Sequence, residues 1–163
     1  MADQTEAIKR LEDSKRSKFI KVTSFYLGNC GVAIIIILLV SKYFKIHIII
    51  PSAFMIISTL LSLKASYKVV CIALMILDGL ITLNWVANFF ICIYEFIIAY
   101  ISFMSICTGD QCALITRTSV ESAIISMITM PVCLVIIYYL LNTIKAAYKY
   151  LKDIKEIEST KSN

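Results

Sequence analysis

Polar surface and the residues typical of enzyme active sites are both scarce in this chain. Of its 163 residues 17% are charged, two are prolines and one, His47, is a histidine. The sequence has no histidine, cysteine and carboxylate set with metal-ligand spacing, no phosphate-binding loop and no nucleophile–base pair. With 60% hydrophobic residues and a mean hydropathy of +0.84, it also has too little polar surface for a soluble domain of this size. We therefore expect a membrane protein that is not an enzyme and binds neither metal nor cofactor.

Four long apolar runs account for this composition. They cover residues 22–40, 46–63, 69–107 and 123–144. A hydrocarbon core about 30 Å thick needs about 20 helical residues to cross it, and each run meets or nears that length. The pattern predicts an all-α, polytopic membrane protein, built as a four-transmembrane-helix bundle.

The third run is nearly twice as long as one span requires. Its middle, residues 84–88, has neither glycine nor proline to reverse the chain. Residues at intervals of three or four would share one face of a continuous helix, and this run has a series of them. The series is Asp78, Ile81, Trp85, Asn88, Cys92 and Glu95. We expect one elongated third helix that leaves the membrane near Glu95, with residues 97–106 extending it or lying along the interface.

The distribution of lysine and arginine indicates the orientation. Six precede the first run, two lie between the second and third runs, and five follow the last, whereas only Lys42, Lys45 and Arg117 fall on the other side. The positive-inside rule then puts both termini in the cytosol. We expect a cytosolic basic segment (1–18), a four-span domain (19–148) and a cytosolic basic tail (149–163). The net charge of +5 favours an anionic leaflet over nucleic acid as the partner.

Asp78 is the acidic residue that this topology places deep in the membrane. It lies about 14 Å along the third helix from its cytosolic start, whereas Glu95 lies about 39 Å along. A charge at depth costs about 2.5–3.5 kcal/mol, so Asp78 must face the bundle interior and be paired or protonated. Candidate partners are Ser24, Asn29, Ser58, Thr59 and Thr129. Two interpretations are open: a relay for protons or ions, and hydrogen-bonding glue between helices. With Trp85, Asn88 and Glu95, Asp78 makes up the predicted intramembrane polar face.

The six cysteines divide by location. Cys107 and Cys112 flank a turn on the outer, oxidising side and predict a disulfide, although a redox-active pair is the alternative. Cys71 lies at the cytosolic interface, where it is either a palmitoylation site or an ordinary membrane residue. The others, Cys30, Cys92 and Cys133, lie within spans and are interpreted as apolar packing residues.

The C-terminal tail has the pattern of an amphipathic continuation of the fourth helix. One side carries Ile144, Tyr148, Leu151 and Ile154. Another carries Lys145, Lys149, Lys152 and Lys155. These lysines predict contact with anionic lipid, although a solvated helix end would have the same pattern.

From about residue 19 to 148 the chain resembles the MARVEL-domain tetraspan proteins, and among them the small fungal branch associated with eisosomes and plasma-membrane microdomains. The resemblance rests on the cytosolic termini, a tight first hairpin, the third-span sequence from Asp78 to Phe90 and the Cys107/Cys112 pair. Asn84 departs from the family, where an aromatic residue is expected. The resemblance implies a non-enzymatic protein that organises membrane microdomains or vesicle trafficking and associates with lipids.

Two other functions remain open on the sequence alone. A small transporter or auxiliary channel subunit would use Asp78, and a membrane thiol oxidoreductase would use Cys107 and Cys112. For a protein that organises microdomains or trafficking, the expected location is the plasma membrane or the secretory pathway. Its expected partners are lipids, other membrane proteins or further copies of the chain.

Overall fold

The computed structural model describes residues 2–40, 45–63, 68–105 and 112–162, and each of these ranges is a single α-helix. The helices are α1 (Ala2–Val40), α2 (Lys45–Leu63), α3 (Lys68–Ser105) and α4 (Cys112–Ser162). Side chains are described for residues 6–39, 50–62, 68–102 and 120–160. The expected all-α architecture is confirmed.

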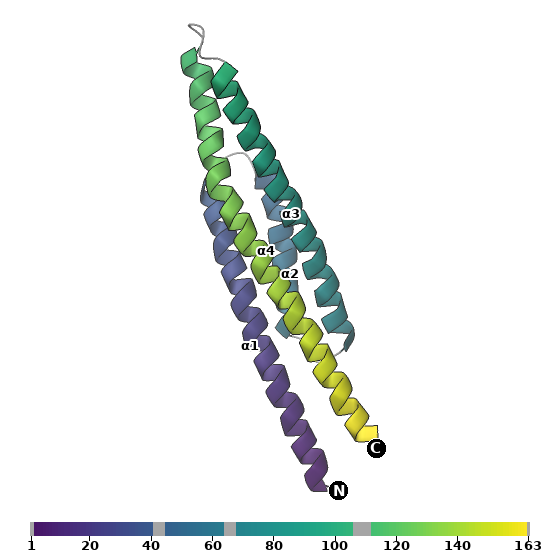
Figure 1. Cartoon of the computed structure of the whole chain (residues 1–163). Coiled ribbons are helices and arrows are strands. Elements are labelled where there is room, and N and C mark those ends of the chain that lie inside the picture. Colours follow the sequence, from purple (N-terminus) through teal and green to yellow (C-terminus); the bar gives the residue numbers. More distant parts are fainter. Residues whose placement is uncertain (1, 41–44, 64–67, 106–111, 163) are drawn as a thin grey trace.

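Consecutive helices run in opposite directions, so that both chain ends lie at the same end of the bundle (Figure 1). Helix α4 packs against α3 and α1, and α2 packs against the same two helices from the other side. At the end away from the termini, the α3–α4 hairpin extends well beyond the α1–α2 hairpin (Figure 1). We call this projecting part the distal hairpin.

Three of the helices are long and apolar enough to cross a membrane: α1, α3 and α4. Helix α2 contributes a shorter apolar stretch, residues 50–62, within the range where its side chains are described. The third apolar run is one helix with no reversal near residues 84–88. Its 38 residues do not set it apart, however, because α1 has 39 and α4 has 51. Neither residue 18 nor residue 148 coincides with a break, so the expected terminal segments continue α1 and α4.

Two groups of buried apolar side chains hold the helices together. The central core lies between all four helices, with Trp85, Ile37, Met55 and Ile136 among its members. The terminal core lies nearer the chain ends and contains Phe19, Cys71, Leu74, Ala147 and Tyr150. Many other large apolar side chains point outward, with Leu39 81% exposed and Val69 75% exposed. Such a surface is stable against lipid and would aggregate in water.

Candidate functional site: a buried aspartate between three helices

The side chain of Asp78 joins three helices. It is fully buried in α3. Ser58 of α2 donates a hydrogen bond to its Oδ1, and the hydroxyl of Thr143 of α4 lies 2.7 Å from its Oδ2. The backbone carbonyl of Asp78 accepts a further bond of 2.6 Å from Thr82. Every oxygen of the residue is therefore hydrogen-bonded, as a buried polar group requires.

The bonds of Thr143 limit where protons can sit. Its hydroxyl oxygen lies 2.7 Å from Asp78 Oδ2 and also 2.7 Å from the backbone carbonyl of Leu140. A hydroxyl has one proton to donate, so it cannot donate to both acceptors. If Thr143 donates to Asp78, the carbonyl of Leu140 receives no proton from it. If Thr143 donates to Leu140 instead, a neutral Asp78 can donate to Thr143, and both contacts are then hydrogen bonds without a buried charge.

The site lies close to the lysine-bearing end of the bundle. Thr143 precedes Lys145, the first exposed lysine after the apolar part of α4, by two residues, or about 3 Å along the helix. Lys21 of α1 reaches a similar level, because Phe19 stacks on Tyr150 of the antiparallel α4. The start of α3 packs beside the lysine-rich part of α4, where Lys68 pairs with Glu158. The depth of about 14 Å expected for Asp78 stays a prediction, because the helices themselves do not mark the membrane boundary.

Ser58 is the one sequence-predicted partner that contacts Asp78. The hydroxyls of Thr59 and Thr129 and the amide of Asn29 donate instead to carbonyls of their own helices, and Ser24 makes no hydrogen bond to Asp78 in the part of the chain described. Thr143 was missed because it stands at the end of its apolar run. A spacing signal did exist: Thr143 continues a series of buried residues at intervals of three and four along α4. The series is Ser126, Thr129, Cys133, Ile136, Leu140, Thr143, Ala147 and Tyr150.

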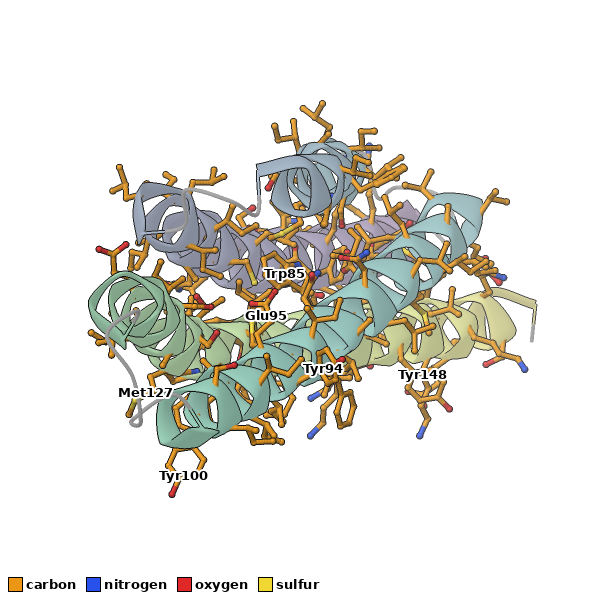
Figure 2. The ribbon with its side chains drawn as sticks, turned by 90° about the horizontal axis from the view of Figure 1, so that it is seen from above. Trp85, Tyr94, Glu95, Tyr100, Met127 and Tyr148 are labelled. Carbon is orange, nitrogen blue, oxygen red and sulfur yellow. The ribbon has the colours of Figure 1, made fainter. Side chains whose placement is uncertain are left out.

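The other residues of the predicted polar face do not contact the Asp78 carboxyl. Trp85 is buried in the central core, and its indole nitrogen has no hydrogen-bond acceptor among the described residues. Asn88 donates to the side-chain oxygen of Asn84, 2.9 Å away in the same helix. Glu95 lies farther along α3, where it is only half-buried. In Figure 2 Trp85 lies among the ribbons, whereas Tyr94, Tyr100 and Tyr148 point away from them.

Four of the six cysteines have described side chains, and all four are buried. Cys71 is fully buried in the terminal core, so its sulfur is not accessible for palmitoylation unless the helices separate. Cys92 of α3 and Cys133 of α4 are both buried and lie close enough to interact, a pairing that the sequence did not indicate. Cys107 and the side chain of Cys112 lie outside the described residues, so their disulfide stays a prediction.

The tail of α4 buries Tyr150 in the terminal core, and Leu151 and Ile154 of its apolar side are partly buried against the same core. Tyr150 stacks on Phe19 with 4.6 Å between ring centroids and is 4% exposed, whereas Tyr148 is 62% exposed. The reason is that the tail continues to pack against α1 and α3 beyond the apolar run. The four lysines predicted to contact lipid are all exposed: Lys145, Lys149, Lys152 and Lys155.

No protein-family model, curated protein or solved structure matches this chain. Among the described residues, no group of three or more histidines, cysteines and acidic residues is placed to hold a metal ion. The function must therefore be inferred from the buried Asp78 site and from the apolar architecture around it.

Proposed function

We propose that this protein is a non-enzymatic, MARVEL-like tetraspan membrane protein that organises membrane microdomains or vesicle trafficking through helix packing and lipid association. The observation that carries the proposal is an excess of apolar helix length. From Lys21 to the end of α1 at Val40 is about 29 Å, close to the thickness of a hydrocarbon core. From Val69 to Met104, over about 53 Å, α3 carries two charged residues, Asp78 and Glu95.

This excess favours an effect on the surrounding membrane. An apolar stretch longer than the local hydrocarbon thickness is accommodated by tilting, by thickening the bilayer or by contact with other proteins. Each of these costs a fraction of a kcal/mol per Å, enough to sort a protein into thicker regions or to drive its association. The exposed apolar side chains of the distal hairpin, among them Tyr100, Ile124 and Met127, are the surface on which this mismatch acts.

The alternating helix directions support four spans. With 19 residues, α2 is about 28 Å long, which nearly equals the hydrocarbon core. It returns the chain to the end where the termini lie (Figure 1), and that end carries most of the lysine and arginine. By the positive-inside rule this end faces the cytosol.

Protease protection tests the topology directly. In sealed right-side-out vesicles, tags on both termini should be protected, while a tag inserted near Gly109 should be cleaved. Cleavage of the C-terminal tag alone would mean an odd number of spans and would overturn the four-span proposal. In living cells, patchy rather than diffuse distribution of the tagged protein is expected.

A small transporter or auxiliary channel subunit is the second candidate, and the buried Asp78 favours it. Intramembrane carboxyls often mark ion or proton pathways. In the described part of the chain, the buried Thr82, Asn88 and Thr129 beyond Asp78 make their hydrogen bonds within their own helices. A pathway would need polar groups that face one another across the bundle, so we rank the organising function first.

A further inference from the structure

A groove of about 410 Å³ lies between α1 and α4 at the end of the bundle where both chain termini emerge. Lys15, Lys18 and Val22 of α1 line one wall, and Ala146, Lys149 and Tyr150 of α4 line the other. It is distinct from the Asp78 site, which lies between α2, α3 and α4. Lys149 is among the lysines expected to contact anionic lipid, but nothing in the proposed architecture assigns a ligand to the groove.

The groove changes from polar to apolar along its length. At the end nearest the termini, Lys15 pairs with Asp153 at 3.0 Å. One turn farther in, Phe19 stacks on Tyr150. Beyond that level, Val22 and Ala146 make the walls apolar. A ligand that fills the groove therefore has a charged part and a hydrocarbon part, in the order found in a membrane lipid.

The charge of the polar end favours an anion. Asp153 neutralises Lys15, but Lys18 and Lys149 are exposed and have no ion pair among the described side chains. One stands on each wall, so that a single group between them can contact both. A phosphomonoester, with about 1.5 to 2 negative charges at neutral pH, matches these two ammonium groups.

We propose that this groove binds the phosphomonoester headgroup of a membrane phospholipid, of the phosphatidic acid or phosphoinositide class. Lys18 and Lys149 hold the phosphate, and an acyl chain lies along Val22 and Ala146. The apolar half of the groove favours a lipid over a soluble phosphate, because a free anion would leave it unfilled. The inference rests on the proposed membrane location of the bundle but not on its organising role.

Binding of short-chain phosphatidic acid to the full-length protein in uncharged detergent micelles tests the proposal. The variant K18Q/K149Q loses two charged hydrogen bonds, and its affinity should fall about 100-fold or more. The matched control is K21Q/K145Q, which also removes one exposed lysine from each helix but none that lines the groove. The affinity of the control should fall less than about tenfold, or about 1.4 kcal/mol, because neither of its lysines lines the groove.

A second variant leaves every lysine in place. Ser14 is exposed at the polar end of the groove, so S14E adds a negative charge beside the phosphate without disturbing a buried side chain. It should weaken binding as K18Q/K149Q does, and circular dichroism should show unchanged helix content for all variants. Equal losses in K18Q/K149Q and K21Q/K145Q, or unchanged affinity in S14E, would overturn the proposal in favour of diffuse surface attraction.

Competition separates a lipid from a soluble anion. Inorganic phosphate and glycerol phosphate, added at the concentration of the lipid, should leave lipid binding unchanged. Displacement of the lipid by either one would overturn the assignment to a lipid. Clustering in the membrane is measured separately. If K18Q/K149Q still clusters but does not bind the headgroup, the proposed organising function stands. If the wild-type protein binds the headgroup but does not cluster, the organising function is contradicted and the lipid-binding groove stands.

Discussion

Asp78 and Thr143 are 65 residues apart in the sequence, and their side-chain oxygens lie 2.7 Å apart in the bundle. With Ser58 they tie α2 and α4 to α3 at one level, between the central and terminal cores. A polar contact fixes the register of two helices more narrowly than apolar packing does, because an unpaired polar group in an apolar interior is costly. This contact therefore fixes the lengthwise register of α3 against α4.

Substitution of Asp78 separates a packing role from a relay role. Asp78→Asn keeps the size and the hydrogen-bonding capacity of the side chain, so folding and membrane clustering should both survive. Asp78→Leu leaves Ser58 and Thr143 without their partner and should lower the free energy of unfolding by about 0.6–2 kcal/mol. Unfolding in mixed micelles measures the difference. A folded Asp78→Asn protein at the right location without cellular activity would instead support the transporter function.

Thr143 tests the same contact from the other helix. Thr143→Val keeps the branched shape but removes the hydroxyl that contacts Asp78, and it should destabilise the bundle by about 0.6–1.7 kcal/mol. Thr129→Val is the matched control, since its hydroxyl donates to the carbonyl of Ile125 in its own helix and to no other helix among the described residues. Equal effects of the two substitutions in the same unfolding assay would mean that the interhelical contact adds no stability.

The contact between Cys92 and Cys133 predicts a specific crosslink. A membrane-permeable oxidant such as copper phenanthroline should join these two thiols in the folded protein, because they belong to adjacent, antiparallel helices. Cys30 is the internal control, since its sulfur lies 3.8 Å from the carbonyl of Ile136. Peptide mapping by mass spectrometry identifies the product. Preferential linkage of Cys30 to either residue would contradict the pairing of α3 and α4.

Replacement of two tyrosines in the tail of α4 by alanine should change the stability of the protein by very different amounts. Tyr150→Ala removes a buried ring that stacks on Phe19 and should cost about 3–5 kcal/mol, the range for large aromatic residues in cores. Tyr148→Ala removes an exposed ring and should change stability by no more than about 0.5 kcal/mol. Thermal unfolding of both variants in detergent measures this. A larger loss for Tyr148→Ala than for Tyr150→Ala would contradict this packing of the tail.

The sequence predicted the broad architecture because length and hydropathy determine it. Apolar runs that are long enough to span a membrane favour helices, and the absence of glycine and proline in residues 84–88 predicted a helix without a reversal. Ser58 was among the expected partners of Asp78 because polar side chains within apolar runs are few.

The details that failed depend on how the helices pair. The spacing along α4 marks Thr143 as an inward-facing position. Its contact with Asp78 and the Cys92–Cys133 contact become visible only once the register of α3 against α4 is known, which hydropathy does not supply. The choice between the two tail tyrosines depends on helix pairing as well. Tyr148 and Tyr150 are equally apolar in the sequence, and packing against α1 decides which of them is buried.

The central claim, that the long apolar helices organise the surrounding membrane, is tested most directly by changing bilayer thickness. Fluorescently labelled protein would be reconstituted at fixed density into phosphatidylcholine vesicles of increasing acyl-chain length, with energy transfer between copies as the measure of clustering. Because mismatch is greatest in thin bilayers, energy transfer should be high there and fall steadily as the bilayer thickens towards the apolar length of α3. Energy transfer that does not depend on thickness would contradict the account.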